Sequence, residues 1–227
     1  MRIASYNIRK AVGLDWRRDA ERILDVLAEI EADVVVLQEA DRRLGSKAGV
    51  LPLEQLEAML SLVPVDVSTR PKSHGWHGNA IFCKTHHDIA QVARIDIPSV
   101  EPRGAVSARL RHPGVEIIGI HLGLTPGVRR RQMRKLAEHI RARPHPVVIA
   151  GDFNEWKADS GIFGDAARMI SPGPSFHASR PTARLDRFVL SGAVEHLSSH
   201  VHRSPLARRA SDHLPIVLDI ALKEAPE

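Results

Sequence analysis

The sequence is poor in cysteine, in aromatic residues and in long apolar runs. Its one cysteine, Cys83, excludes an internal disulfide framework and is typical of a reducing compartment. Aromatic residues make up only 4% of the chain, which leaves few platforms for stacking unpaired bases. The longest apolar runs have the length of a strand, so no transmembrane segment is predicted. Because the first residues alternate and reach a polar residue by Ser5, they are unlike a signal peptide, and we expect a cytoplasmic protein.

Basic residues outnumber acidic ones and give a formal net charge of +5. This excess favours a phosphate-ester substrate, carried by a small molecule, a lipid head group or a nucleic acid. Many of the arginines fall in 127–143, a predicted helix that Thr125 would cap and Pro126 would begin. Its apolar stripe consists of Met133, Leu136, Ala137 and Ile140. The arginines on its other faces are interpreted as a solvent-facing surface rather than a dedicated DNA-binding helix.

Runs of strand length alternate with segments of helical period along the chain. Strands are predicted over 2–8, 33–40, 79–84, 89–95, 105–110, 115–122, 146–154, 185–192 and 214–222. Further helices are predicted over 19–32 and 52–62. No low-complexity linker or break in composition divides the chain, so residues 1–227 are expected to form a single domain. The pattern predicts the α/β class, with two packed mixed β-sheets flanked by helices in a four-layer α/β sandwich.

The segment PVVIAGDFNEW, residues 146–156, passes abruptly from an apolar run to a carboxylate and an amide. If the backbone stays extended beyond Gly151, Asp152 and Asn154 point to the same side at the carboxyl end of a central strand. That position often carries ligands in α/β sheets. Glycine, aspartate and asparagine also form turns, so the segment alone is compatible with either interpretation.

Similar polar side chains recur at the ends of most predicted strands, which favours a site over a turn. They are Asn7, Gln38, Glu39, Asn79, His121, Asp152, Asn154, Asp186, Asp212 and His213. Carboxylates, amides and imidazoles are the groups that bind a hard metal ion and transfer protons. Converging carboxylates would repel one another in a partly buried site, and a divalent cation with an imidazolium would offset that repulsion. The pattern therefore indicates metal-assisted chemistry.

Seven motifs stand in order between Tyr6 and Ile216: SYNIR, LQEAD, GNAI, IHLG, AGDFNEW, RLDRFVLSG and SDHLPI. Together they resemble the endonuclease/exonuclease/phosphatase superfamily, which includes DNase I-like nucleases, abasic-site endonucleases, neutral sphingomyelinases and inositol-polyphosphate 5-phosphatases. The resemblance covers nearly the whole chain. It implies the four-layer sandwich predicted above and hydrolysis of phosphate esters with Mg²⁺, or Mn²⁺, as cofactor.

The resemblance also implies a metal site. Glu39 matches the metal-binding glutamate and Asn7 the asparagine beside it, while Asp212 is expected to be an additional ligand. Taken alone, Asn7 would more often be a turn or cap residue, and Asp212 could belong to a turn before a strand.

Five residues match the catalytic positions of the resembled family. Asp152 matches the aspartate near the attacking water, either as its base or as a second metal ligand, and Asn154 the amide that steadies the phosphate. His213 matches the histidine that contacts the phosphoryl oxygens, with Asp186 orienting it, and His121 is a candidate acid for the leaving oxygen. Outside this resemblance, Asp186 could simply pair with a neighbouring arginine, and His121 could be an ordinary core histidine.

Asn79 and Arg103 are expected to contact substrate, although Asn79 could cap a turn and Arg103 could be solvated.

The chain departs from abasic-site endonucleases because its one tyrosine is Tyr6, next to Asn7, and because ARLDRF lacks flanking aromatics on the LD motif. No long apolar insertion for entering a bilayer is visible. The sequence predicts a divalent-metal-dependent phosphoesterase that cleaves a phosphodiester ahead of a monoester, with no stable protein partner implied. The alternatives are a DNA endonuclease or exonuclease, and a catalytically silent phosphate- or nucleic-acid-binding protein.

Overall fold

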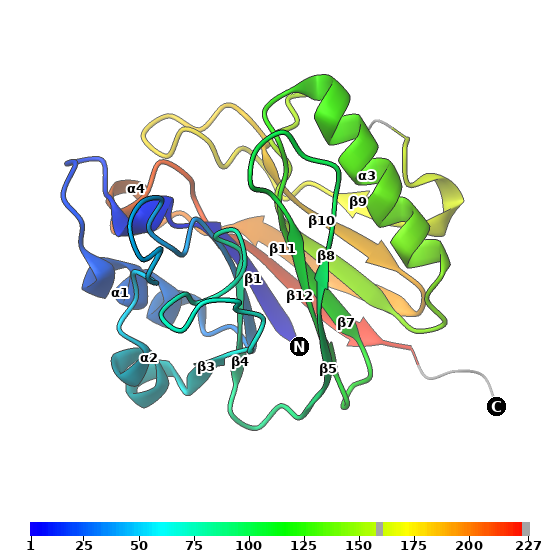
Figure 1. Ribbon diagram of the computed structural model, residues 1–227, viewed down its shortest axis with the longest axis horizontal. Coiled ribbons are helices and arrows are strands. Elements are labelled where there is room, and N and C mark those ends of the chain that lie inside the picture. Colours follow the sequence, from blue (N-terminus) through cyan, green and yellow to red (C-terminus); the bar gives the residue numbers. More distant parts are fainter. Residues whose placement is uncertain (158–160, 224–227) are drawn as a thin grey trace.

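Two mixed six-stranded sheets pack face to face in the computed structural model, which describes residues 1–157 and 161–223 (Figure 1). The first sheet has the order β11(Val194–Val201), β12(Ile216–Leu222), β1(Arg2–Asn7), β2(Val34–Gln38), β4(Ala80–Lys84), β3(Leu62–Pro64). The second has the order β5(Ile89–Ile95), β6(Ala105–Leu110), β7(Glu116–His121), β8(Val147–Asp152), β10(Asp186–Ser191), β9(Arg168–Ile170). Each sheet contains one parallel pair, β1–β2 in the first and β7–β8 in the second. The carboxyl ends of these pairs carry most of the predicted polar residues.

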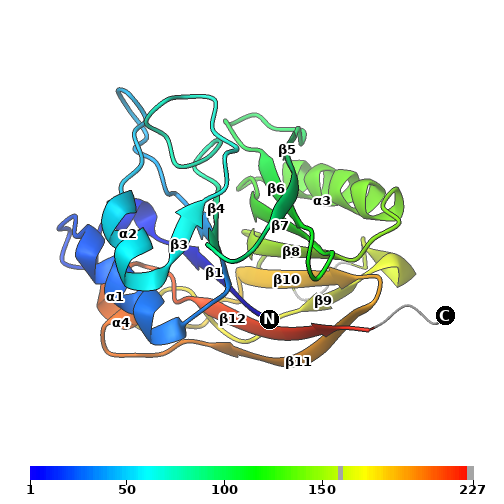
Figure 2. The same cartoon turned by 90° about the horizontal axis from the view of Figure 1, so that it is seen from below.

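Helices cover the outer faces of both sheets (Figure 2), so the predicted four-layer sandwich is confirmed. The first sheet is flanked by α1(Ala20–Ile30), α2(Leu53–Leu60) and α4(Ala207–Ala210), and the second by α3(Pro126–Arg141). The apolar stripe of α3 packs on the outward side chains of the second sheet. Thr125 is the N-cap residue of α3, as predicted, but its side chain makes no capping hydrogen bond.

Three strands and one short helix gave no signal in the sequence: β3, β9, β11 and α4. Strand β11, with the sequence VEHLSSHV, lies at the edge of the first sheet, and most of its side chains are exposed or half-buried. An exposed edge strand needs no apolar face, so its sequence lacks the alternation by which strands are recognised. Strands β3 and β9 span only three residues each.

The alternation of side chains along the central strands directs the predicted site residues into the space between the sheets. On β8, Val148 and Ala150 belong to the core shared by the two sheets, whereas Val147 and Ile149 pack under α3. Asp152 stands two residues after Ala150, so its side chain also points into the space between the sheets. Strands β7 and β10 direct their terminal polar residues to the same side in the same way.

The sheets approach each other closely at Gly119 on β7. A Cβ atom at this position would lie 2.7 Å from Cγ1 of Val36 on β2 in the opposite sheet. This distance is shorter than van der Waals contact, so the close packing of the two parallel pairs requires glycine here.

Candidate active site between the sheet ends

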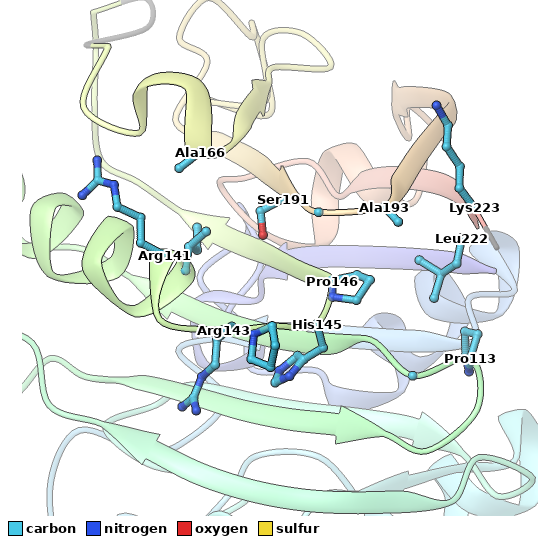
Figure 3. A pocket seen from close by; sticks show the side chains of 14 residues that line it. Pro113, Arg141, Arg143, His145, Pro146, Ala166, Ser191, Ala193, Leu222 and Lys223 are labelled. Carbon is cyan, nitrogen blue, oxygen red and sulfur yellow. The ribbon is translucent and has the colours of Figure 1, made fainter. Parts of the chain in front are cut away.

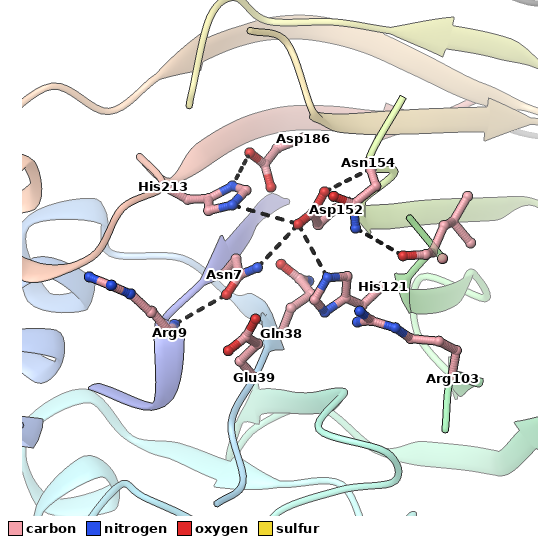
Figure 4. Close-up of polar contacts among 12 residues, drawn as sticks. Asn7, Arg9, Gln38, Glu39, Arg103, His121, Asp152, Asn154, Asp186 and His213 are labelled. Atoms are coloured by element: carbon pink, nitrogen blue, oxygen red, sulfur yellow. Dashed lines mark hydrogen bonds and ion pairs between the residues drawn. The ribbon is translucent and has the colours of Figure 1, made fainter. Parts of the chain in front are cut away.

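Asp152, at the end of β8, lies at the centre of a buried polar cluster (Figure 4). Its Oδ2 accepts a hydrogen bond of 3.1 Å from Nδ2 of Asn7, which ends β1 in the other sheet. The same oxygen lies 3.4 Å from Nε2 of His121 and 3.7 Å from Nε2 of His213. Residues from β1, β7 and the segment before β12 therefore converge on the carboxylate at the end of β8.

Pairing between neighbouring strands explains this convergence. His121 on β7 is the register partner of Asp152, and so is Asp186 on β10. Directly paired residues of neighbouring strands have adjacent side chains on one face. The three residues are thus brought together by strand pairing rather than by loop conformation.

His213 is held between two carboxylates. Its Nδ1 lies 2.9 Å from Oδ2 of Asp186, which also accepts a hydrogen bond of 2.5 Å from Oγ of Ser175. Burial lowers the pKa of His213, but the negative charges of Asp186 and Asp152 outweigh this effect and raise the pKa to about 9. His213 is therefore an imidazolium at neutral pH.

His121 has the opposite electrostatic environment. Burial lowers its pKa to about 3, because the charge of Asp152, which raises it, is opposed by the positive charges of Arg103 and His213. One neutral and one protonated histidine thus face the same carboxylate. Environments that separate the pKa values of neighbouring titratable groups are common in acid–base catalysis.

The GDFN segment forms a turn and also supplies the site. Strand β8 extends through Asp152, whose Oδ1 accepts a hydrogen bond of 2.8 Å from the backbone N–H of Asn154. Asn154 has a positive φ of 49°, so the chain turns at this residue instead of remaining extended. Its side chain donates to the backbone carbonyl of Leu122 at 2.9 Å and joins the ends of β8 and β7. The two interpretations of this segment are compatible because the turn fixes the carboxylate.

Glu39 and Asp212, both expected to bind metal, are half-buried and each pairs with a basic residue. Lys10 Nζ contacts Oε2 of Glu39, and Arg9 Nε lies 3.4 Å from Oδ2 of Asp212. Arg9 also donates its backbone N–H to Oδ1 of Asn7 at 3.1 Å. The carboxylates therefore lie beside Asn7 in a region where positive charge is already concentrated.

Unusual backbone conformations occur at the same place. Arg9, Lys10 and Ala11 have φ values of 47°, 58° and 58°, and Glu39 has a φ of 54°. Positive φ is unfavourable for residues with a Cβ and often accompanies functional sites. The turn at 9–11 brings the backbone N–H of Lys10 to 3.1 Å from the carbonyl oxygen of Glu39.

Asn79 and Arg103 lie close to each other, next to the Asp152 cluster rather than within it. Nδ2 of Asn79 donates to the backbone carbonyl of Gly104 at 2.9 Å, and Arg103 pairs with Glu101 at 3.1 Å. The charge of Arg103 acts on both His121 and Lys10, whose pKa values it lowers. Arg103 therefore lies close enough to the cluster to act on a bound anion.

Two groups of side chains within the candidate site could hold a divalent cation. Asp152, Asp186 and His213 have ligand atoms within 4.8 Å of one another, but a cation there would have to displace the proton of His213. The other group is Asn7, Glu39 and Asp212.

The second group offers only oxygen ligands, the set that Mg²⁺ prefers. Beside it, Oε1 of Gln38 and Oδ1 of Asn79 are buried without a hydrogen-bond partner among the described residues. Unsatisfied acceptors in a buried site are well matched to a cation or to its bound water. The residues present therefore fit a magnesium site, with Lys10 contacting Glu39 in this structure.

Several residues of the site escaped prediction. Arg9 and Lys10 stand two and three residues after Asn7 in the SYNIRK segment, so their proximity to Asn7 could have been inferred. Ser175, which donates to Asp186, lies in an irregular stretch without periodicity and gave no signal. The same stretch supplies Phe176, whose ring centroid lies 4.9 Å from that of His213.

A separate hollow of about 760 Å³ opens at the opposite end of the sheets (Figure 3). Pro113, Arg143, His145 and Lys223 are among its lining residues. None of the ten predicted site residues lines it, so this hollow is unrelated to the Asp152 cluster.

Known proteins resemble the chain in sequence and in structure. The sequence profile of the Endonuclease/Exonuclease/phosphatase family matches residues 4–213. The protein YbhP of Escherichia coli (strain K12) is 30% identical over 165 residues, which cover 65% of this chain and 64% of YbhP. No helix within the described ranges is long and apolar enough to span a bilayer.

Two solved structures share the fold. The endonuclease/exonuclease/phosphatase from Beutenbergia cavernae DSM 12333 is 25% identical, with a TM-score of 0.73, over 100% of this chain and 72% of the other. TDP2 of D. rerio, in complex with a single-stranded DNA product, is 19% identical, with a TM-score of 0.75, over 97% and 98% of the two chains. At that identity the second likeness concerns the fold alone.

Proposed function

Because the chain belongs to the endonuclease/exonuclease/phosphatase family, we propose that it is a divalent-metal-dependent phosphoesterase that cleaves a phosphodiester ahead of a monoester. Members of this family hydrolyse phosphoester bonds. The observation that carries the proposal is the environment of Asp152: a buried carboxylate bonded to Asn7 and faced by one neutral and one protonated histidine. A protein that only binds phosphate has no need for this arrangement of proton-transfer groups.

Asp152 acts on the attacking water. Its Oδ2 takes a proton as the water oxygen bonds to phosphorus, and the bond between phosphorus and the leaving oxygen breaks. A proton from solvent completes the departing alcohol, so one water and one diester give one monoester and one alcohol. Asn7 and the backbone N–H of Asn154 hold the carboxylate in place through the two hydrogen bonds of 3.1 Å and 2.8 Å.

The two histidines act on the same side of phosphorus as the water. Attacking and leaving oxygens lie roughly in line across phosphorus, so groups beside the base lie nearer to the attacking water than to the leaving oxygen. His213 and His121 both lie within 3.7 Å of Asp152. His213 therefore binds a non-bridging phosphoryl oxygen with its positive charge, as the resemblance implied. For His121 the same geometry favours positioning of the water over the role of leaving-group acid that the resemblance implied.

Asn7, Glu39 and Asp212 would hold the cation. When bound, Mg²⁺ would supply positive charge that offsets the negative charge of the phosphate ester. Lys10, which contacts Glu39, would have to release that carboxylate to such a cation, and its ammonium group would then be available to an anion. Asn79 and Arg103 line the neighbouring side of the site, where the guanidinium contacts the substrate phosphate.

A panel of substrates tests the proposal. We expect purified protein to release nitrophenol from bis(4-nitrophenyl) phosphate with Mg²⁺ or Mn²⁺, more slowly from 4-nitrophenyl phosphate, and from neither when a chelator is present. Plasmid DNA in the same panel tests the nuclease alternative, since preferential nicking of DNA would replace the present proposal. Phosphate binding without turnover of any substrate would support the catalytically silent alternative.

A further inference from the structure

Nine large apolar side chains among the described residues are exposed, and five of them are more exposed than the other four. Trp16, Leu44, Val100, Leu124 and Trp156 are between 62% and 84% exposed. The remaining exposed large apolar residues, Leu53, Met59, Val92 and Leu197, are between 36% and 58% exposed and lie on α2 and on the edge strands β5 and β11. Single exposed apolar residues are common, so the position of these five is the informative property.

All five lie in segments that open around the candidate active site. Trp16 and Leu44 follow β1 and β2, Leu124 and Trp156 follow β7 and β8, and Val100 precedes β6. These are the strand ends that carry Asn7, Glu39, His121 and Asp152, together with the segment of Arg103. We call these five residues the apolar rim.

Contacts connect the apolar rim to the site. The guanidinium of Arg9 lies 4.5 Å from the ring centroid of Trp16. The ring of Trp156 is 6.4 Å from that of Phe176, which packs against His213. The two tryptophans of the rim are therefore connected to the site by ring and cation contacts. The other three residues are placed at the same end of the sheets by the strands that they follow or precede.

Exposed arginines stand next to two of the five rim residues in the sequence. Trp16 is followed by Arg17 and Arg18, and Leu44 is preceded by Arg42 and Arg43, all four exposed. Residues 42–50 contain three basic residues and no acidic one. Arg42 and Arg43 form no ion pair with any described residue.

The basic segments also converge in space. Arg9 and Arg103 lie on two sides of the polar cluster around Asp152 (Figure 4). Lys10 contacts Glu39 in the same region. Positive charge from two separate segments thus gathers beside the site.

We propose that this face docks on an anionic phospholipid bilayer, so that the phosphoester reaches the site from the membrane interface. The inference rests on the proposed function only for the nature of the substrate. Exposed tryptophan and aliphatic side chains enter the interface, and arginines bind anionic head groups. A nucleic acid fits less well, since Leu44, Val100 and Leu124 cannot stack on bases.

Flotation of the full chain with vesicles tests the docking. We expect binding to vesicles of phosphatidylglycerol and phosphatidylcholine, and little binding to phosphatidylcholine alone. The double substitution Leu44→Ser and Val100→Ser should weaken binding to the anionic vesicles roughly tenfold. The matched control, Val92→Ser with Leu197→Ser, should bind as the unaltered protein does.

The charge component has its own control. Arg42→Gln with Arg43→Gln should weaken binding roughly thirtyfold, five- to sixfold for each arginine. Arg134→Gln with Arg141→Gln, which removes the same charge from exposed positions of α3, should have a much smaller effect. Unchanged melting temperatures would exclude misfolding as the cause.

Soluble substrate separates this inference from the proposed function. The Leu44 and Val100 variants should hydrolyse bis(4-nitrophenyl) phosphate at the unaltered rate. Turnover of that diester without vesicle binding would overturn the docking and leave the proposed function standing. Vesicle binding without turnover of the diester would support the docking and overturn the proposed function. Tighter binding of a single-stranded oligonucleotide than of anionic vesicles, weakened by the same rim substitutions, would replace the membrane with nucleic acid.

Discussion

Replacing Glu116 tests whether buried charge stabilises the sheet that carries half of the site. Glu116 begins β7, is almost fully buried, and lies 3.1 Å from His139, 2.9 Å from His145 and 3.4 Å from Arg143. Burial raises the pKa of its carboxyl group, but hydrogen bonds from His139 and His145 outweigh that effect and lower it from 4.5 to about 2. The native state thus favours the ionised form of the Glu116 carboxyl group much more strongly than the unfolded chain does.

The size and the pH range of the effect follow from that pKa. At about 1.4 kcal/mol for each tenfold change in acidity, the ionised carboxylate contributes about 3 kcal/mol at neutral pH. Because the folded pKa is depressed, the contribution is complete above about pH 4.5 and is lost as the pH falls toward 2. By the same linkage about 1.4 kcal/mol remains at pH 3.

Urea unfolding at several pH values measures this contribution. Glu116→Gln should lower the free energy of unfolding by roughly 2–3 kcal/mol at pH 7, and the difference from the unaltered protein should fall to less than half at pH 3. Glu57→Gln, at an exposed position of α2, should change it by less than about 0.5 kcal/mol. A Glu116→Gln protein as stable as the original at pH 7, or a difference independent of pH, would refute the reasoning.

Three further predictions concern the site and the sheet packing. Glu39→Gln should abolish most of the rise in melting temperature caused by Mg²⁺, whereas Glu54→Gln, exposed on α2, should keep it; an undiminished rise would exclude Glu39 as a ligand. Lys10→Met should tighten Mg²⁺ binding by roughly twofold to tenfold in calorimetry, because no ammonium competes for Glu39; weaker binding would contradict this. Gly119→Ala should cost about 1–3 kcal/mol of stability in urea, and Val36→Ala in the same chain should relieve part of that loss; strict additivity would disprove the contact.

The sequence predicted the elements whose side chains must be buried. Strand β8 carries a continuous apolar run and helix α1 a periodic apolar stripe, because β8 is buried on both faces and α1 packs against a core on one side. Edge strand β11 has no such constraint and was missed. The long-range partners of Glu116 were equally invisible, since they come from the end of α3 and the segment after it, 23 to 29 residues away.

The candidate site could be predicted in outline because its residues stand at strand ends. Strand pairing then brings His121, Asp152 and Asp186 together without help from the loops. The pairing of Glu39 with Lys10 could not be foreseen, because it depends on the left-handed turn at 9–11, which residues with a Cβ rarely adopt. Residues supplied by irregular segments, such as Ser175, need the tertiary structure to be recognised.

The turnover of Asp152→Asn tests the central claim most directly. The substitution keeps the size of the side chain but removes the charge and the basicity that activate water. With bis(4-nitrophenyl) phosphate and saturating Mg²⁺, we expect kcat to fall by at least two orders of magnitude, within the range of roughly 10²–10⁴ for a general base. The protein should remain folded but melt at a lower temperature, because the amide cannot accept the hydrogen bonds from both Asn7 and Asn154. Asp165→Asn, at an exposed position, should retain full activity. If the Asp152→Asn protein keeps more than about a tenth of the original turnover, Asp152 takes no part in the chemistry and the proposed mechanism is wrong.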